Sequence, residues 1–346
     1  MLPYAVEFTR PGDFLFGEAM RPTVASGFIK SALKIRISCM IWGGAGVGKS
    51  SVVRQISQEL GRRLVDIRLS LIDPTDLRGF PYRDGGVMRW APACFLPQDR
   101  DSTDILFLDE VNSAPPAVQA AAYQLILDRK IGEYSLPDGV SVVAAGNRET
   151  DRGITFTMPA PLANRFLHID PFEVNFDDWR AWAMHEGLRP EVINFINYRP
   201  ALLNDFDGSK KAFPTPRTWE FVHRVLEDHN PMDVERAMVG GAVGEGAGAE
   251  FAGFLKIFRS LPNPDVVLMN PKTAEVPTDP ATLYALCGAL SARASEANFD
   301  RLITYCGRMK PEFQVLTIRD SVKRTPDLAQ MQAFTTWAIE NHSVLI

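Results

Sequence analysis

The sequence lacks a long hydrophobic run, and no stretch reaches the roughly 18 apolar residues that a membrane-spanning helix needs. The first residues also lack the basic start, the apolar centre and the small-residue cleavage site of a secretory signal. We therefore expect no membrane span and no secretion, and we expect the protein to be cytoplasmic.

Cysteine is scarce as well, since the 346 residues include four cysteines, with no CxxC pair and no matching histidine cluster. This spacing argues against structural zinc and against a disulfide framework, and a reducing cytoplasm fits it. Basic residues are not in excess, because 37 Lys and Arg stand against 42 Asp and Glu, for a net charge of −5. Proteins that coat nucleic acid usually carry a basic face, so this balance disfavours nucleic acid as the main partner.

The first half of the chain alternates short apolar runs with amphipathic segments, which is the pattern of a parallel sheet flanked by helices. The apolar runs are rich in Ile, Leu or Val and are bounded by Gly, Pro or polar residues. They predict strands at 36–42, 64–69, 105–109, 140–146 and 167–170. The clearest helices are expected at 49–60 and 115–129, and the second opens on prolines, whose missing amide protons cost little there.

Residues 70–98 break this rhythm, because prolines and glycines are interspersed with Phe80, Tyr82 and Trp90. We interpret this stretch as a loop or hairpin whose aromatic side chains either contact a partner or pack on their own domain. Strand signals fade after residue 171, and the second half is expected to be helical. The helices predicted there are 177–186, 218–228, 250–261, 282–292 and 328–341, and the five prolines of 262–280 predict an extended link.

The pattern G-x-x-x-x-G-K-[ST] runs from Gly43 to Ser50, between an apolar strand and a helix. Its glycines let backbone amides turn towards phosphate oxygens, and the helix N-terminus adds positive potential. Lys49 would reach the β- and γ-phosphates, and Ser50 would ligate Mg²⁺. The predicted ATP-binding residues are Gly43, Gly44, Ala45, Gly46, Val47, Gly48, Lys49, Ser50 and Ser51.

Two further strands end in polar residues at the carboxyl edge of the sheet, where ligands of open α/β sheets bind. Four apolar residues precede Asp109 and Glu110. Asp109 is expected to hold Mg²⁺ through water, and Glu110 to polarise the water that attacks the γ-phosphate. Asn147, directly after the next apolar run, would reach the γ-phosphate or orient that water, although an Asn there could also cap a turn. Together the motifs predict ATP hydrolysis.

Arg165 precedes the last predicted strand, and Arg217 lies where a helix should begin. The fixed charge and planar fork of arginine suit phosphate contact, but spacing alone assigns neither residue, since surface ion pairs occupy most arginines.

With these motifs the sequence resembles the MoxR group of AAA+ ATPases over most of its length. The resemblance is carried by residues 43–50, 108–116 with their Asp-Glu-x-Asn-x-Ala-Pro-Pro phrase, 145–149, 161–166 and 214–217. Residues 119–137 are similar to one bacterial branch, whose members are usually paired with a von Willebrand factor A-like protein.

The resemblance implies an α/β fold: an AAA+ αβα P-loop nucleotide-binding domain with a five-stranded parallel sheet at 1–171, with an insert within 70–98. A helical lid at 172–261 and a C-terminal helical extension at 262–346 would follow. It further implies a ring, usually a hexamer. Asn147 would be sensor 1, Arg165 the arginine finger inserted into the neighbouring subunit's site, and Arg217 the sensor 2 of the lid. Asn112 and Glu133 lie in family-like positions without an assigned role.

The leading hypothesis is an ATP-driven remodelling chaperone that acts on a protein client with a von Willebrand factor A-like partner. An alternative is a factor that activates a metalloenzyme or inserts its cofactor. A nucleic-acid motor is a third, for which Arg83 and Arg89 offer modest phosphate contact against the acidic total. A nucleotide-gated scaffold is a fourth, which the intact Glu110 disfavours.

Overall fold

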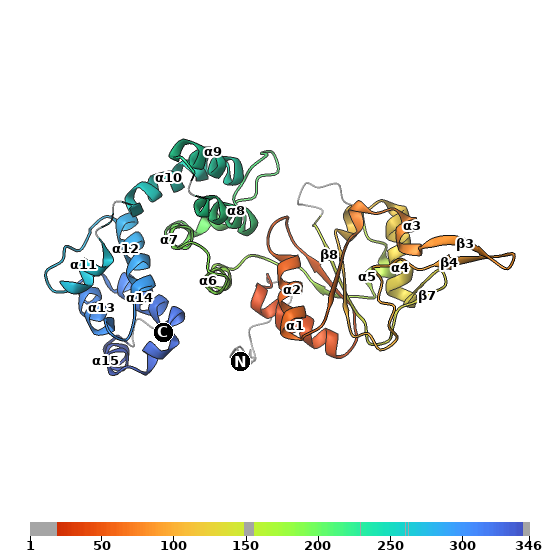
Figure 1. Cartoon of the computed structure of the whole chain (residues 1–346), viewed down its shortest axis with the longest axis horizontal. Helices are drawn as coiled ribbons and strands as arrows, with labels where there is room; N and C mark the ends of the chain where they lie inside the picture. Colours follow the sequence, from red (N-terminus) through yellow and green to blue (C-terminus); the bar gives the residue numbers. More distant parts are fainter. Residues whose placement is uncertain (1–18, 149–155, 229, 260, 262, 342–346) are drawn as a thin grey trace. The chain divides into compact units, whose positions relative to one another are not determined.

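A computed structural model of the chain describes residues 19–148, 156–228, 230–259, 261 and 263–341. The chain divides into two compact units, Met1–Asp178 and Trp179–Ile346. The first unit contains a sheet flanked by helices, whereas the second is built from helices (Figure 1). The finer division into a lid and a C-terminal extension stays a prediction.

Among the helices that the structure describes, none has both the length and the hydrophobicity that crossing a membrane requires.

The core of the first unit is a five-stranded parallel sheet with the strand order β2-β5-β8-β1-β9. Its strands are β1 (Cys39–Trp42), β2 (Leu64–Arg68), β5 (Ile105–Asp109), β8 (Ser141–Gly146) and β9 (Leu167–Ile169). Each matches a predicted strand to within a few residues. Because all pairs are parallel, the carboxyl ends of the strands lie at one edge, and the predicted fold class is confirmed.

Helices cover both faces of this sheet. They are α1 (Pro22–Lys34), α2 (Lys49–Glu59), α3 (Pro74–Arg78), α4 (Pro116–Asp128) and α5 (Ala160–Ala163). In β5, Ile105 and Phe107 share one core with buried residues of α1 and α2, while Leu106 and Leu108 share the other with α4. A strand covered on both faces is apolar at every position, which explains why short continuous runs predicted the strands.

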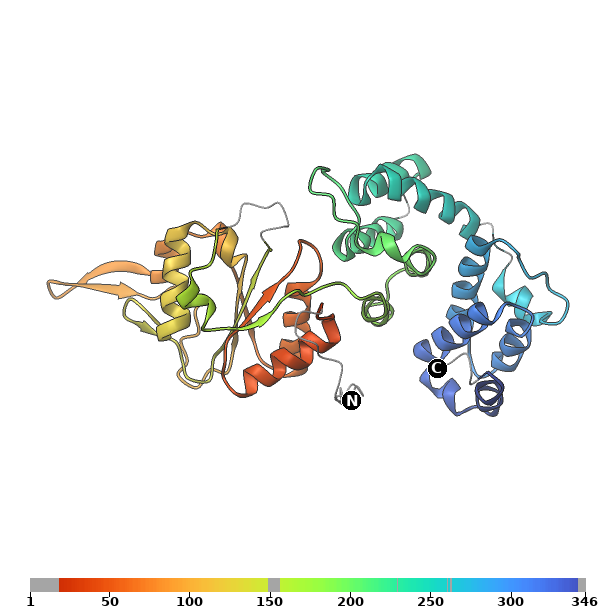
Figure 2. The same cartoon turned by 180° about the vertical axis from the view of Figure 1, so that it is seen from behind.

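Two hairpins accompany the sheet. β3 (Phe80–Asp84) and β4 (Val87–Ala91) pair antiparallel, and so do the shorter β6 (Lys130–Ile131) and β7 (Tyr134–Ser135). The β3–β4 hairpin extends away from the body of the unit in both views (Figures 1 and 2). Of the two readings of residues 70–98, loop or hairpin, the hairpin is confirmed over Phe80–Ala91, whereas the short helix α3 in the same stretch was not predicted.

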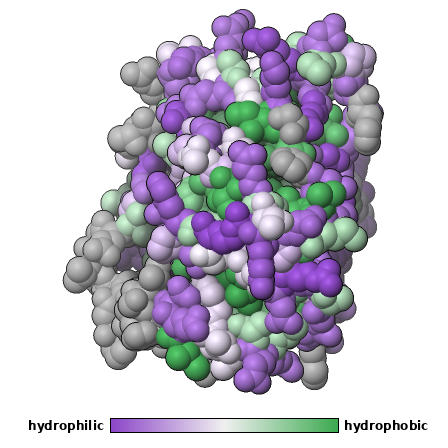
Figure 3. Space-filling model, turned by 90° about the vertical axis from the view of Figure 1, so that its left-hand side faces the viewer, coloured by the Kyte–Doolittle hydropathy of each residue, from purple (hydrophilic) through white to green (hydrophobic). Residues whose placement is uncertain are grey.

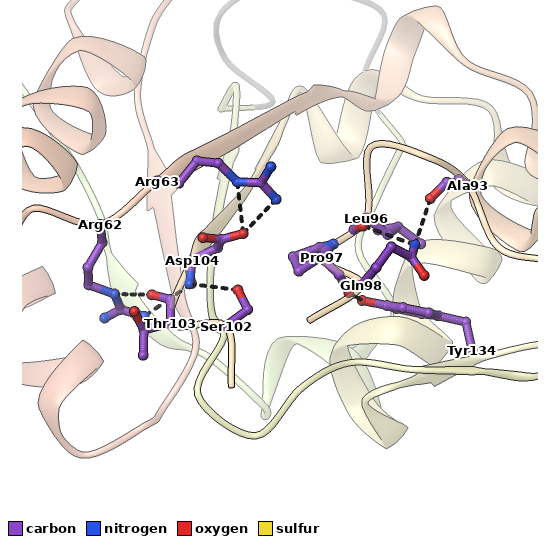
Figure 4. A network of polar contacts seen from close by, with 10 residues as sticks. All are labelled: Arg62, Arg63, Ala93, Leu96, Pro97, Gln98, Ser102, Thr103, Asp104 and Tyr134. Carbon is purple, nitrogen blue, oxygen red and sulfur yellow. Dashed lines mark hydrogen bonds and ion pairs between the residues drawn. The ribbon is translucent and has the colours of Figure 1, made fainter. Parts of the chain in front are cut away.

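Polar contacts hold the segment that returns from the β3–β4 hairpin to β5 (Figure 4). The Tyr134 hydroxyl donates to the Pro97 carbonyl oxygen at 2.6 Å. Nearer the strand, the Arg63 guanidinium donates to the Asp104 carboxylate at 2.7 and 2.9 Å. Arg62 donates to the Asp104 carbonyl oxygen at 3.1 Å. These contacts hold the returning segment to β7 at Pro97 and to the residues before β2 at Asp104.

The second unit continues from α6 (Phe176–His185), which begins at the end of the first. Its further helices are α7 (Pro190–Tyr198), α8 (Pro216–Glu227), α9 (Met232–Val243), α10 (Glu245–Arg259), α11 (Pro264–Met269), α12 (Pro280–Arg293), α13 (Phe299–Cys306), α14 (Pro311–Arg324) and α15 (Gln332–Glu340). The prediction of an extended link over 262–280 is wrong in part, because α11 lies within it. Pro264 occupies the first turn of α11, where proline is tolerated, so a proline taken as a breaker instead starts a helix. The helix predicted at 328–341 is also shorter, since α15 begins only at Gln332.

Two groups of buried side chains stabilise the second unit. The rings of Phe195, Trp219 and Phe251 pack within 5.6 Å of one another, centroid to centroid. A second core lies between α11, α12, α13, α14 and α15. On the molecular face drawn in Figure 3, hydrophobic residues lie in small groups between hydrophilic ones, which is ordinary for a protein surface.

A buried ion pair joins α6 to α14, because Arg180 and Asp320 contact each other with 3% of each side chain exposed. We expect Asp320→Ala to lower the free energy of unfolding of this unit by about 3–5 kcal/mol, since it removes the carboxylate that a buried guanidinium contacts. Urea titration followed by circular dichroism measures this loss. The matched control is Asp265→Ala, whose carboxylate pairs with Arg293 at 2.9 Å on the surface. It should cost no more than about 1 kcal/mol, and equal losses would contradict the prediction.

Candidate nucleotide-binding site

The loop from Gly43 to Gly48 joins the carboxyl end of β1 to the start of α2. Gly48 caps α2 with a φ of 102°, a left-handed conformation that a side chain would strain. The first amides of an α-helix have no partner within the helix, so those of α2 are oriented for an anion. Ser51 is exposed in the first turn of α2. The loop therefore has the predicted position between strand and helix.

Lys49 is buried, with 8% of its surface exposed. Its ammonium group donates to the carbonyl oxygens of Gly43 and Gly44, at 2.6 and 2.8 Å. It also donates to the side-chain oxygen of Asn147 at 3.1 Å. The structure thus brings together the lysine of the loop and the asparagine at the end of β8, which are 98 positions apart in the chain.

Ser50 and Asp109 form the second part of the site. The Ser50 hydroxyl donates to the Asp109 carboxylate at 2.8 Å, and the other carboxylate oxygen accepts the Glu110 amide at 2.9 Å. Hydroxyl and carboxylate oxygens are the ligands that Mg²⁺ prefers, so this pair fits the predicted metal position. The negative site also affects β2, where burial, and after it the charge of Asp109, raise the pKa of Asp66.

Glu110 leaves the strand in a left-handed conformation, with a φ of 57°. The Ser70 hydroxyl donates to its carboxylate, and the Arg68 guanidinium lies 3.6 Å from it. Sequence reasoning missed both contacts. The signal for them is positional, because Arg68 ends β2, β2 neighbours β5, and parallel strands bring their carboxyl ends to one edge.

The two predicted arginines lie in different units. Arg165 is exposed and follows α5, immediately before β9. Arg217 is exposed in the first turn of α8, where Thr215 caps the helix by accepting the Thr218 amide. Their roles as arginine finger and sensor 2 stay predictions.

These residues provide what hydrolysis of a phosphoanhydride needs. Lys49 and the loop amides offer positive charge to phosphate oxygens, and the Glu110 carboxylate can accept a proton from an attacking water. Ser50 and Asp109 would hold Mg²⁺, which when bound neutralises charge on the phosphate oxygens. Asn147 adds a neutral amide beside Lys49, at the place predicted for a γ-phosphate contact.

Part of the chain matches a family of known proteins. Residues 38–166 match the family model of the AAA domain of the dynein-related subfamily. Over 178 residues, 49% of this chain, the sequence is 28% identical to midasin of Giardia intestinalis. This match spans 4% of the length of that midasin.

Solved structures of nucleotide-binding proteins are similar to the chain only in a general way. NtrX from Brucella abortus in complex with ADP has a TM-score of 0.41 and 15% identity, over 96% of this chain and 70% of NtrX. A mutant RuvB of Thermotoga maritima has a TM-score of 0.38 and 16% identity, over 77% of this chain and 79% of RuvB. Residues 38–166, which match the AAA domain, hold every part of the predicted site except Arg217.

Proposed function

We propose that the chain is a ring-forming ATPase of the MoxR group that remodels a protein client, with a von Willebrand factor A-like protein as its partner. ATP would bind between neighbouring copies, and the energy of hydrolysis would move the part of the ring that touches the client. The cytoplasm is the proposed location, and the free thiols of all four cysteines support it.

The observation that carries this proposal is the β3–β4 hairpin, which belongs to the same unit as the ATP site (Figure 1). Phe80, Tyr82 and Val87 are 76%, 46% and 61% exposed. The pairing register puts all three on one face of the hairpin, since Val87 faces Asp84 and Tyr82 lies two residues before Asp84. Grouped exposed hydrophobic side chains of this kind are typical of surfaces that bind other proteins.

Arg89, one of the two arginines of the hairpin, is paired with carboxylates of its own unit. Arg89 lies 3.4 Å from the Asp84 carboxylate and 3.7 Å from that of Glu133. Its positive charge is therefore largely balanced within the unit, which leaves little net charge for phosphates. A metalloenzyme remains one class of client, because the same apolar face would serve an activation factor.

The position of Arg165 supports a ring. The residue is exposed, so a neighbouring copy of the chain could receive its guanidinium. An arginine supplied by the next subunit makes hydrolysis depend on assembly.

A hairpin variant tests the proposal. We expect Phe80→Thr combined with Val87→Thr to keep basal ATP turnover, because both residues lie outside the site and threonine suits a strand. Turnover stimulated by an unfolded model polypeptide should fall about 10-fold, as removal of roughly 1.4 kcal/mol of contact energy implies. Steady-state assays with the polypeptide, with single-stranded DNA and with duplex DNA measure the effect.

The control is Ile35→Thr, which removes a side chain that is also 61% exposed but lies at the end of α1. It should leave both rates unchanged. Stimulation by DNA and not by polypeptide would contradict protein remodelling. If the polypeptide stimulated the hairpin variant as much as the wild type, the hairpin would not be part of the contact surface.

A further inference from the structure

Asn112 uses its whole side-chain amide to bind the backbone of Asn147. Its amide nitrogen donates to the Asn147 carbonyl oxygen at 2.7 Å, and its amide oxygen accepts the Asn147 backbone N–H at 3.1 Å. Asn112 is 2% exposed, so water does not compete for these bonds. Both backbone groups of the residue that faces Lys49 are thus held by one side chain.

Asn147 needs this contact because the pairing between β5 and β8 ends before it reaches that residue. The ladder between β5 and β8 ends at Leu108 and Ala144, because the chain leaves β5 and turns left-handed at Glu110. Asn147 lies beyond the last paired residue of β8, where β5 can no longer serve its backbone. Buried backbone groups need partners, and the Asn112 amide replaces the missing strand.

Gly146 allows the Asn112 side chain to come close to the backbone of Asn147, because glycine has no Cβ. A Cβ at this position would lie 2.6 Å from the Asn112 amide oxygen and 2.7 Å from the terminal methyl of Met40. Asn112 is also held through its own backbone, since its carbonyl oxygen accepts the Phe156 N–H at 2.7 Å. The bridge is therefore anchored at its Asn112 end.

We propose that Asn112 is a positioning residue for ATP hydrolysis, which acts by fixing the backbone of Asn147 so that the Asn147 amide stays directed at Lys49 and the γ-phosphate. The inference rests on the proposed role of Asn147 as the residue that contacts this phosphate. Asparagine suits the task because it presents one donor and one acceptor side by side. An aspartate would present two acceptors, one of them against the Asn147 carbonyl oxygen, and an alanine would present neither group.

Two substitutions test the inference, Asn112→Ala and the nearly isosteric Asn112→Asp. We expect kcat to fall up to about 10²-fold in both, the size of effect that a displacement near 1 Å produces. The dissociation constant for ADP should stay within about 2-fold, since the loop and Lys49 are untouched. Affinity for a non-hydrolysable ATP analogue should fall, so the preference for ATP over ADP is lost. Fluorescent-nucleotide titration and single-turnover assays measure these quantities.

A double-mutant cycle separates positioning from general damage. If Asn112 acts through the Asn147 side chain, Asn112→Asp should cost nothing further in an Asn147→Ala background. The matched control is Gln119→Ala, which removes another buried amide of the same unit, one that donates to the Ala114 carbonyl oxygen at 2.9 Å. It should reduce stability and leave kcat unchanged.

The inference is overturned if Asn112→Asp keeps the wild-type kcat, or if its affinity for ADP falls as much as its affinity for the ATP analogue. It is also overturned if the kcat losses of Asn112→Asp and Asn147→Ala multiply in the double variant. Asn112→Asp decides the question if Asn112→Ala does not fold, because it keeps the volume of the side chain. Failure of client remodelling is a separate result, since it would leave basal turnover and these nucleotide affinities as they are. Full activity in Asn147→Ala would remove the role of Asn147 and, with it, the inference.

Discussion

Arg165→Ala should lower ATP turnover by about 10³–10⁵-fold, the contribution of an arginine that stabilises the charge of the transferring phosphoryl group in trans. Arg165 is exposed. In the proposed ring its effect on hydrolysis would come through the site of another copy. ATP binding should change little, because Lys49, Ser50 and Asp109 remain.

Mixing subunits provides the decisive measurement. Lys49→Ala removes the ammonium group that binds the loop, so this subunit should bind no ATP yet still supply Arg165 to its neighbour. Arg165→Ala subunits should bind ATP and lack the cation. Each variant alone should be inactive, and a mixture should recover part of the activity, because some sites pair an intact loop with an intact arginine.

Arg63→Ala is the matched control for the loss of an exposed arginine. Arg63 pairs with Asp104 at 2.7 Å before β2, at the amino ends of the strands and away from the loop. Its turnover should stay within about 2-fold of wild type, as expected for a surface ion pair. If the mixture of inactive subunits shows no recovery, or if turnover per subunit is independent of protein concentration, Arg165 does not act between copies.

Much of the site could be predicted because its parts are local in sequence. The loop that contains Lys49 needs only a glycine-rich turn between a strand and a helix, and the first four residues of β5 are apolar because both faces of the strand are covered. A carboxylate that ends such a strand must then lie at the sheet edge. The order of the strands is not local, since it depends on which apolar faces pack together over long sequence separations.

For this reason the contacts between strands were not predicted. Ser70 meets Glu110 because β2 neighbours β5, and Asn112 meets Asn147 because β5 neighbours β8. Ser70 does not stand out by its type or by its neighbours, and the motif that contains Asn112 does not say which residue its side chain contacts. In the helical unit the predicted helices omitted α7, α9, α13 and α14. Proline caused a further error, since Pro264 marks the first turn of a helix and was interpreted as part of a link.

The Glu110→Gln variant should bind ATP and fail to turn it over. Glutamine keeps the size of the side chain and still offers an oxygen to the Ser70 hydroxyl, but a neutral amide cannot accept the proton of the attacking water. A loss of about 10²–10⁴-fold in kcat is expected from removal of a general base. Because hydrolysis no longer returns the site to its ADP state, the ATP-bound assembly should also persist, which mass photometry with and without ATP would detect as a larger fraction of rings.

Glu133→Gln separates this effect from a simple loss of negative charge. The Glu133 side chain is 45% exposed, and its carboxylate lies 3.7 Å from the Arg89 guanidinium of the hairpin. The Glu133→Gln variant should keep basal turnover within about 2-fold of wild type. If Glu110→Gln retained turnover, another group at the same edge of the sheet would have to act as the base. Asp109 is not available for this, because its carboxylate accepts hydrogen bonds from the Ser50 hydroxyl at 2.8 Å and from the Glu110 amide. No other carboxylate is assigned to the site. The measurement therefore decides between two roles for Glu110: it activates the water, or it only closes the site through its contacts with Ser70 and Arg68.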